Sequence, residues 1–303
     1  MSYLQAVNNM EWYYVLLIVL GSVLLFLCCV IAFMIYPGNP KKCIEHSWMY
    51  GNKIAHRGLF NNEKGIVENT KTAFLLAIEN NYNIETDISL TKDEEIIVYH
   101  DNDFKRLFNV DKKICELTLK EIQELRYENS QDIVMEFSEF LKLINGKTGL
   151  ILEFKSHSSK RDVLLCKKAM ELLKDYQGKY VVQSFQPLIV RWFKKNYPII
   201  PRGQLFMKFD LKKEKELTKG QAFKKRAVSM ITKWLYNHKM TNCLARPVFI
   251  DHSFHNIDTM AKIIHLKVPM LVYTVTTQKD YDYIVNKVDN VIFENLELNK
   301  NGK

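Results

Sequence analysis

The chain has 303 residues, 47% of them hydrophobic, and a formal net charge of +9 at pH 7. This length allows one barrel-sized domain with additions or two smaller domains, and the hydrophobic content is enough for a large core. The basic balance favours an anionic partner such as a membrane surface or a phosphorylated substrate, whereas the lack of zinc-knuckle, helix-turn-helix and RNA-recognition signatures excludes nucleic acid as the expected partner.

A long apolar run occupies residues 13–36, after an N-terminal tail of residues 1–12. At a rise of about 1.5 Å per residue, a helix of this length crosses a hydrocarbon core of about 30 Å. A secretory signal is the alternative, but signals have a basic start and a shorter apolar core. This tail holds Glu11 and neither lysine nor arginine. We therefore predict a retained transmembrane helix, with aromatic residues such as Trp12 and Tyr36 at its two interfaces.

The charges that flank this run predict its orientation. Lys41, Lys42 and Lys53 follow the run, and no basic residue precedes it. Because positive residues accumulate on the cytoplasmic side of a membrane, we expect a single-pass protein of the cell membrane whose main domain is cytoplasmic. A linker of residues 37–52 begins with prolines and a glycine that end the helix.

Short apolar runs suited to strands alternate with helical patterns over residues 53–298. The expected strands are Ile54–Ala55, Ile84–Leu90, Leu150–Phe154, Tyr180–Val182, Gly203–Phe206, Val248–Ile250, Met270–Val275 and Val291–Phe293. The expected helices are Thr70–Asn80, Arg161–Tyr176, Pro187–Asn196, Ile257–Leu266 and Lys279–Val288. This alternation predicts an α/β fold of the (β/α)8, or TIM barrel, type. An open doubly wound sheet is the alternative, which the lack of a GxGxxG motif after an early strand disfavours.

Two intervals are too long for simple loops and are interpreted as insertions. Residues 102–135 include a helical stretch near Thr118–Arg126. Residues 207–246 hold most of the net charge, with eleven Lys and Arg against three Asp and Glu in the segment from Lys208 to Arg246. Apolar residues recur there at helical spacing beside the basic ones, which fits either an interfacial helix on anionic lipid or an amphipathic helix that covers the barrel.

Charged side chains end the expected strands where a barrel places its active site. In chain order they are His56 and Arg57, Glu85 and Asp87, His100 and Asp101, and Glu153 and Lys155. Residues two apart share one face of a strand, so the paired carboxylates and the paired ExK residues point the same way. One such residue is commonly structural, but the same property at several strand ends indicates a shared site.

The residue types of this group indicate phosphodiester hydrolysis. Glu85, Asp87 and Glu153 form an all-oxygen ligand set that suits Mg²⁺ or Ca²⁺. Arg57 and Lys155 supply positive charge for a phosphate. Histidine is the usual general acid or base near neutral pH, and the sequence leaves open which histidine has which role.

The ordered motifs HRG (56–58), ENT (68–70), ExD (85–87), HD (100–101) and ExK (153–155), with QSF (183–185) and YTV (273–275), resemble the glycerophosphodiester phosphodiesterase family from Lys53 to Asn295. The resemblance implies a TIM barrel of the phospholipase C-like phosphodiesterase type, with an insertion after the second strand. It also implies one divalent cation, Ca²⁺ or Mg²⁺, and cleavage of a glycerophosphodiester to glycerol 3-phosphate and an alcohol.

The same resemblance implies a role for each matching residue. His56 and His100 would be the acid–base pair, and Arg57 and Lys155 would bind phosphate. Metal binding would fall to Glu85, Asp87 and Glu153, and Phe185 and Tyr273 would line the substrate pocket. Glu68 has two possible roles, as a metal ligand or in orienting His56 and its loop. The nucleophile is either water or the substrate's own glycerol 2-hydroxyl.

The chain departs from the family pattern at three places, which bear on the substrate more than on activity. Val67 stands where the family usually has proline, Tyr273 where it has tryptophan, and Phe293–Glu294 where it has Thr-Asp. A lysophospholipase D that acts on intact lysophospholipids is therefore an alternative function. A barrel that binds lipid without catalysis is another, but it predicts a missing histidine or carboxylate, and all are present.

Overall fold

Eight parallel strands close into a barrel, because β1 (Ile54–His56) pairs with both β2 (Asn83–Leu90) and β12 (Asn290–Phe293). The computed structural model describes residues 3–217 and 223–296. Between β2 and β12 the barrel continues through β7 (Leu150–Phe154), β8 (Tyr180–Ser184), β9 (Arg202–Phe206), β10 (Phe249–Ser253) and β11 (Met270–Val275). Each strand contains one of the eight expected runs or overlaps it, so the predicted barrel is confirmed and the open sheet is wrong.

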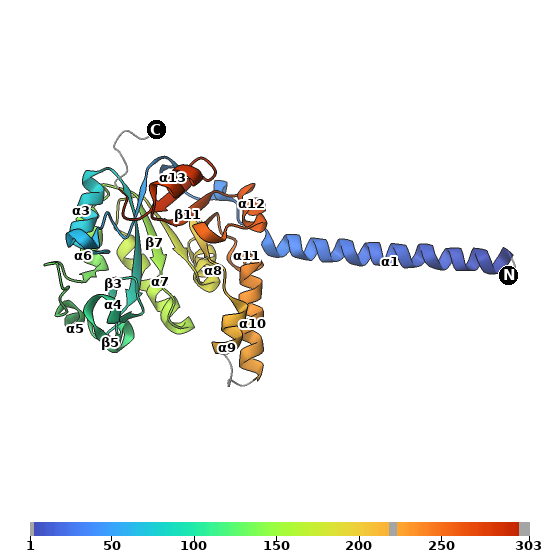
Figure 1. Cartoon of the computed structure of the whole chain (residues 1–303), viewed down its shortest axis with the longest axis horizontal. Helices are drawn as coiled ribbons and strands as arrows, with labels where there is room; N and C mark the ends of the chain where they lie inside the picture. The colour runs from blue at the N-terminus through green and yellow to red at the C-terminus, as the bar shows by residue number, and fades with distance from the viewer. Residues whose placement is uncertain (1–2, 218–222, 297–303) are drawn as a thin grey trace.

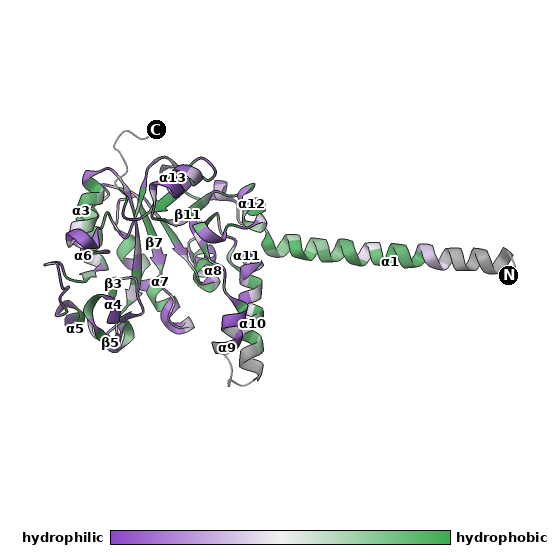
Figure 2. Ribbon diagram, in the orientation of Figure 1, coloured by the Kyte–Doolittle hydropathy of each residue, from purple (hydrophilic) through white to green (hydrophobic). Residues whose placement is uncertain are grey.

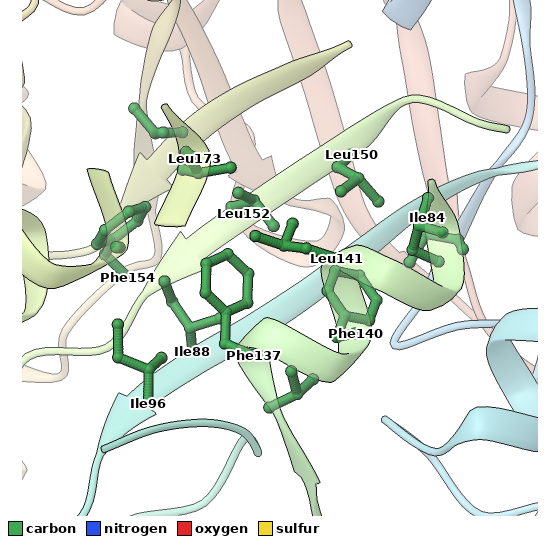
Figure 3. Packing of buried hydrophobic residues seen from close by; sticks show 14 of the residues in the cluster. Ile84, Ile88, Ile96, Phe137, Phe140, Leu141, Leu150, Leu152, Phe154 and Leu173 are labelled. Atoms are coloured by element: carbon green, nitrogen blue, oxygen red, sulfur yellow. The ribbon is translucent and has the colours of Figure 1, made fainter. Parts of the chain in front are cut away.

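Helices surround the barrel (Figure 1). They are α3 (Lys71–Glu79), α6 (Phe137–Ile144), α7 (Ser159–Leu173), α8 (Pro187–Asn196), α12 (Thr259–His265) and α13 (Gln278–Ile284). The sequence analysis did not predict α6. Its apolar residues Phe137, Phe140 and Leu141 face strands β2 and β7 and pack against residues such as Leu152 and Ile88 (Figure 3). This spacing of three and four residues buries one side of the helix.

The first insertion forms a small layer beside the barrel. Strands β3 (Ile96–Val98) and β6 (Met135–Glu136) extend β2 in antiparallel fashion. Between them lie β4 (Asp103–Phe104), α4 (Lys105–Phe108), β5 (Val110–Lys113), η3 (Ile114–Glu116) and α5 (Leu119–Gln123), which falls within the expected helical stretch. Tyr99, Phe104, Ile122 and Tyr127 form a separate hydrophobic cluster, so the insertion has its own core.

The N-terminal end of the barrel is filled by apolar side chains. The linker forms η1 (Pro40–Lys42) and α2 (Trp48–Gly51), and Met49 of α2 packs with Ile54, Ile151 and Phe249 inside the barrel. Two further 3-10 turns, η2 (Asn62–Lys64) and η4 (Phe254–Asn256), follow β1 and β10. The strand ends that carry the charged residues lie at the opposite end.

Gly203 leaves the space that the ring of Phe249 fills, since a Cβ built on Gly203 would lie 2.1 Å from Phe249 Cε2. Phe249 is fully buried, so the ring has little room to move. We expect Gly203→Ala to lower the free energy of unfolding by about 1–3 kcal/mol through overpacking. Chemical denaturation measures this loss, and Gly51→Ala, where nothing lies within 4 Å of the added Cβ, is the control.

The N-terminal helix α1 (Tyr3–Ile35) projects away from the barrel, and apolar residues cover much of its length (Figures 1 and 2). The span Trp12–Ile35 has a mean hydropathy of 3.2, and none of the residues in its apolar window is buried inside the protein. It is long and apolar enough to cross a membrane, by length and composition. The helix ends just before Pro37, as the sequence predicts.

A polar joint fixes the end of α1 to the barrel. Arg246 donates to the carbonyl oxygens of Phe33 and Tyr36 at 2.9 and 2.5 Å, and its guanidinium lies over the Phe33 ring. Asn242 of α11 (Asn242–Ala245) donates to the carbonyl of Ile35 at 2.9 Å. Carbonyls at a helix C-terminus lack intrahelical partners, so these side chains cap the helix and hold its direction.

The second insertion forms α9 (Leu211–Leu217) and α10 (Phe223–Asn237) before α11. In Figure 1, α10 runs across the direction of α1 on the side of the barrel from which α1 emerges. Tyr236 of α10 is buried, whereas Val228, Ile231 and Trp234 are exposed by 57%, 59% and 43%. These three residues, at intervals of three, form an outward apolar stripe, which we call the α10 stripe.

Candidate active site

Three carboxylates meet inside the barrel. Glu85 and Asp87 of β2 and Glu153 of β7 are buried, and their ligand oxygens lie within 4.8 Å of one another. The register pairs Asp87 with Glu153 on the adjacent strand. Along β2, Ile84 and Ile88 join the core between sheet and helices, so alternation turns the acidic residues into the barrel.

Two cations neutralise part of this charge. Lys155 Nζ lies 2.8 Å from Glu153 Oε1 and 3.1 Å from Asp87 Oδ1. Arg57 Nε lies 3.5 Å from Asp87 Oδ2. Burial would raise the pKa of Asp87, but the charges of Lys155, His100 and Arg57 lower it below its ordinary value. The predicted phosphate-binding residues therefore lie beside the predicted metal ligands.

The three buried carboxylates are suited to bind a divalent cation. Burial raises the pKa of Glu85 well above its ordinary value, and the charges of Asp87 and Glu153 raise it further. Glu85 Oε2 is buried and has no hydrogen-bond partner among the described residues. Buried, mutually repelling oxygens of this kind suit Mg²⁺ or Ca²⁺, which would provide the missing positive charge.

The ENT segment supports the site from one side. Asn69 donates to Asp87 Oδ2 at 3.0 Å and accepts from Thr86 at 2.7 Å, which orients the Asp87 carboxylate. Thr70 accepts from the Ala73 amide and caps α3. Glu68 contacts Arg57 at 2.7 Å and also pairs with Arg106. These contacts favour its role in orienting the loop over a role as a metal ligand.

His56 lies at the end of β1, as predicted, between two carboxylates. Its Nδ1 lies 2.9 Å from Glu294 Oε2, and its Nε2 lies 3.8 Å from Glu85 Oε2. Burial and the charge of Arg57 lower the pKa of His56, although Glu294 opposes this. If the imidazole is neutral and its Nδ1 donates to Glu294, its Nε2 is directed toward the three buried carboxylates.

Glu294 is a site residue that the sequence analysis noted only as a departure from the family pattern. It follows β12 directly, and β12 pairs with β1 where the barrel closes. Its position as an acid at the end of the last strand was the signal that could have indicated a role. Because the partner is His56, at the other end of the barrel sequence, the contact itself depends on closure.

His100 approaches from the insertion side and not from a barrel strand. It lies just after the antiparallel strand β3, so the expectation that all the charged residues end barrel strands is wrong for this one. His100 Nδ1 lies 2.7 Å from Asp101 Oδ1. The two histidines thus have the same arrangement, with a carboxylate at Nδ1, which sets the tautomer and orientation of each ring.

Two aromatic residues form part of the barrel wall. The rings of Phe185 and Tyr273 are 5.9 Å apart and nearly perpendicular. Tyr273 OH donates to the carbonyl of Phe206 at 2.9 Å, which fixes the ring. Both side chains are partly exposed, as a substrate-pocket wall requires.

Comparison with known proteins gives a consistent family match. The model of the glycerophosphoryl diester phosphodiesterase family matches residues 56–297. YhdW of Bacillus subtilis is 34% identical over 157 residues, which cover 49% of this chain and 63% of that protein. A glycerophosphodiester phosphodiesterase of Caldanaerobacter subterraneus subsp. tengcongensis is 30% identical over 167 residues, covering 50% and 65%. The chain thus spans just under two thirds of these curated relatives.

Among solved structures, a phosphodiesterase of Oleispira antarctica in complex with the product sn-glycerol-3-phosphate has the same fold. The TM-score is 0.62, with 19% identity, over 81% of this chain and 93% of that one. A glycerophosphodiester phosphodiesterase of Parabacteroides distasonis gives a TM-score of 0.60 with 22% identity, over 80% and 92%. These likenesses establish the barrel fold.

Proposed function

Because the chain belongs to the glycerophosphoryl diester phosphodiesterase family, we propose that it hydrolyses glycerophosphodiesters to glycerol 3-phosphate and an alcohol. The observation that carries this proposal is the meeting of three buried carboxylates, two cations and two carboxylate-paired histidines at one end of the barrel. This set combines a cation site, a phosphate clamp and an acid–base pair, which are the parts that phosphodiester cleavage needs.

The residues would divide into three roles. Glu85, Asp87 and Glu153 would hold one divalent cation, Ca²⁺ or Mg²⁺, which when bound stabilises negative charge on the phosphate. Arg57 and Lys155 would bind phosphate oxygens. One histidine would take the proton of the nucleophile, and the other would donate a proton to the leaving alcohol. If the nucleophile is water, glycerol 3-phosphate forms directly. If it is the substrate's 2-hydroxyl, a cyclic phosphate forms first, and water then opens it to glycerol 3-phosphate.

A direct assay tests the activity. The purified full-length chain in detergent should release glycerol 3-phosphate from glycerophosphocholine. A chelator should stop the release, and added Ca²⁺ or Mg²⁺ should restore it. Product formation that persists after complete chelation would contradict the cation requirement. Failure to cleave any glycerophosphodiester with either ion would favour the inactive lipid-binding barrel.

Intact lysophospholipids are the second candidate substrates, and the α10 stripe and helix α1 favour them because both would bring the site to a lipid surface. The comparison is between glycerophosphocholine in solution and a lysophosphatidylcholine in micelles, at equal concentration and with the same detergent present in both assays. Choline release should be faster from the lysolipid if the lysophospholipase D activity is the main one. Faster release from glycerophosphocholine would support the first proposal.

We also propose that α1 crosses the cell membrane and that the barrel lies on the cytoplasmic side. The length and hydropathy of Trp12–Ile35 support the crossing, and the lysines after it support the orientation. With α1 along the membrane normal, the joint at Arg246 would hold α10 against the bilayer surface. The α10 stripe would then enter the interface.

Vesicle binding by a chain that starts at Pro37 tests the docking of α10 on the bilayer. Replacement of Ile231 and Trp234 by serine should weaken its partitioning to anionic vesicles at least tenfold, since each buried apolar side chain contributes about 1.5–3 kcal/mol. Val163 and Leu172 of α7, both exposed by 39%, are replaced by serine as the matched control. Equal binding of the two double variants would contradict the docking of α10.

A further inference from the structure

We propose that Arg106 is a positioning residue that holds His100 in its reactive orientation by fixing Asp101, a role that rests on the proposed phosphodiesterase function. Arg106 belongs to α4 in the first insertion. Its Nε lies 2.7 Å from Asp101 Oδ2, and its Nη1 and Nη2 lie 2.9 and 2.6 Å from the two oxygens of Glu68. One guanidinium therefore joins two carboxylates from different segments.

Asp101 uses its two oxygens for two different partners. Oδ1 accepts from His100 Nδ1 at 2.7 Å, and Oδ2 accepts from Arg106. Burial would raise the pKa of Asp101, but the hydrogen bonds from His100 and Arg106 lower it below its ordinary value. Asp101 is thus an acceptor at both ends, and a proton held at His100 Nδ1 leaves Nε2 free to exchange protons with a substrate.

Glu68 is the fixed point of this arrangement. Its side chain is 5% exposed, and it pairs with Arg57, the residue that follows β1, as well as with Arg106. The planar fork of arginine can bind Glu68 with two donors while its Nε binds Asp101. A lysine has one charged nitrogen and cannot reproduce this geometry.

The consequence is that the insertion and the barrel share one chain of ion pairs. It runs from Arg57 through Glu68, Arg106 and Asp101 to His100. In this series of ion pairs, Arg106 is linked to His100 only through Asp101. A small displacement of a reacting group can reduce turnover about 10²-fold. Loss of the Arg106–Asp101 contact should therefore slow the chemical step more than it weakens substrate binding.

Kinetics on the full-length chain test the proposal with Arg106→Gln and Arg106→Lys. We expect kcat for glycerophosphocholine to fall at least tenfold in both variants, with KM changed less than threefold. Arg126→Gln is the matched control, because Arg126 lies in the same insertion and contacts backbone carbonyls of Gln123 and Leu125. Its kcat should stay within twofold of the parent value.

Two further measurements separate positioning from loss of fold. In the Asp101→Asn background, Arg106→Gln should change kcat less than twofold, since both changes break the same link. In protein with ¹⁵N-labelled histidine, the His100 signal, assigned by its loss in His100→Ala, should show a fixed Nδ1–H tautomer in the parent chain. It should show a mixture of tautomers in both Arg106 variants.

The outcomes distinguish the two proposals. Parent-like kcat and an unchanged His100 signal in both Arg106 variants would overturn the positioning role, as would equal losses of kcat in the parent and Asp101→Asn backgrounds. If the parent chain cleaves no glycerophosphodiester, the proposed function fails, and the His100 signal alone decides whether Arg106 holds the ring. A changed tautomer in Arg126→Gln would also count against it.

Discussion

Replacement of His56 or His100 by alanine is expected to lower turnover of glycerophosphocholine by about 10²-fold or more, while the protein stays folded. A positioned general acid or base contributes about 10²–10⁴-fold to a rate. Both rings are paired through Nδ1 with a carboxylate, Glu294 for His56 and Asp101 for His100. Steady-state kinetics with the purified full-length variants measure the loss, and thermal unfolding checks the fold.

His265→Ala is the matched control for this prediction. His265 of α12 lies 2.8 Å from Asp289, so it also forms a histidine–carboxylate pair, but one outside the catalytic group. Its removal should change kcat less than twofold. Near-normal turnover of either the His56 or the His100 variant would remove that residue from the acid–base pair, and a large loss in the His265 variant would indicate that the assay reports stability.

Local sequence patterns were enough to predict the barrel and its carboxylates. In β2, apolar Ile84 and Ile88 alternate with Glu85 and Asp87, and the two-residue period of a strand allows only one arrangement of these faces. The LILEF sequence of β7 follows the same rule less completely. Helix α6 was missed although Phe137, Phe140, Leu141 and Ile144 have helical spacing, because its eight residues follow the insertion directly.

Contacts between distant segments could not be predicted from the sequence. Glu294 and His56 are 238 residues apart, and Arg106 and Glu68 are 38 apart. Barrel closure brings the first pair together, and folding of the insertion core brings the second. A single sequence contains the residues of these pairs but not the register of β12 on β1, or the position of α4, on which the contacts depend.

The second large effect is expected at the three buried carboxylates, where a substitution should change stability as well as activity. Glu85→Gln should abolish turnover and also make the ion-free protein more stable than the parent chain. In the ion-free state, burial and the charges of Asp87 and Glu153 raise the pKa of Glu85. An acid whose pKa is raised on folding binds its proton more tightly in the folded protein. The free energy of unfolding therefore falls as pH rises above the pKa of glutamate in the unfolded chain, about 4.3.

The pH dependence gives the sign. Glutamine resembles the protonated glutamate and does not titrate, so the advantage of the variant should be small near pH 4 and should grow as pH rises until it passes the folded pKa of Glu85. Chemical denaturation in a chelator at pH 5 and pH 8 measures this difference. Asp175→Asn, at an exposed position, is the control and should show no such gain.

Added Ca²⁺ or Mg²⁺ should reverse the order of stability. An ion that binds only the folded protein adds about 2.7 kcal/mol at a concentration of 100 times its Kd. The parent chain and Asp175→Asn should gain this stabilisation, and Glu85→Gln should lose most of it because one anionic ligand is gone. A variant that is less stable than the parent without ions and equally stabilised with them would show that Glu85 supports the fold instead of a cation.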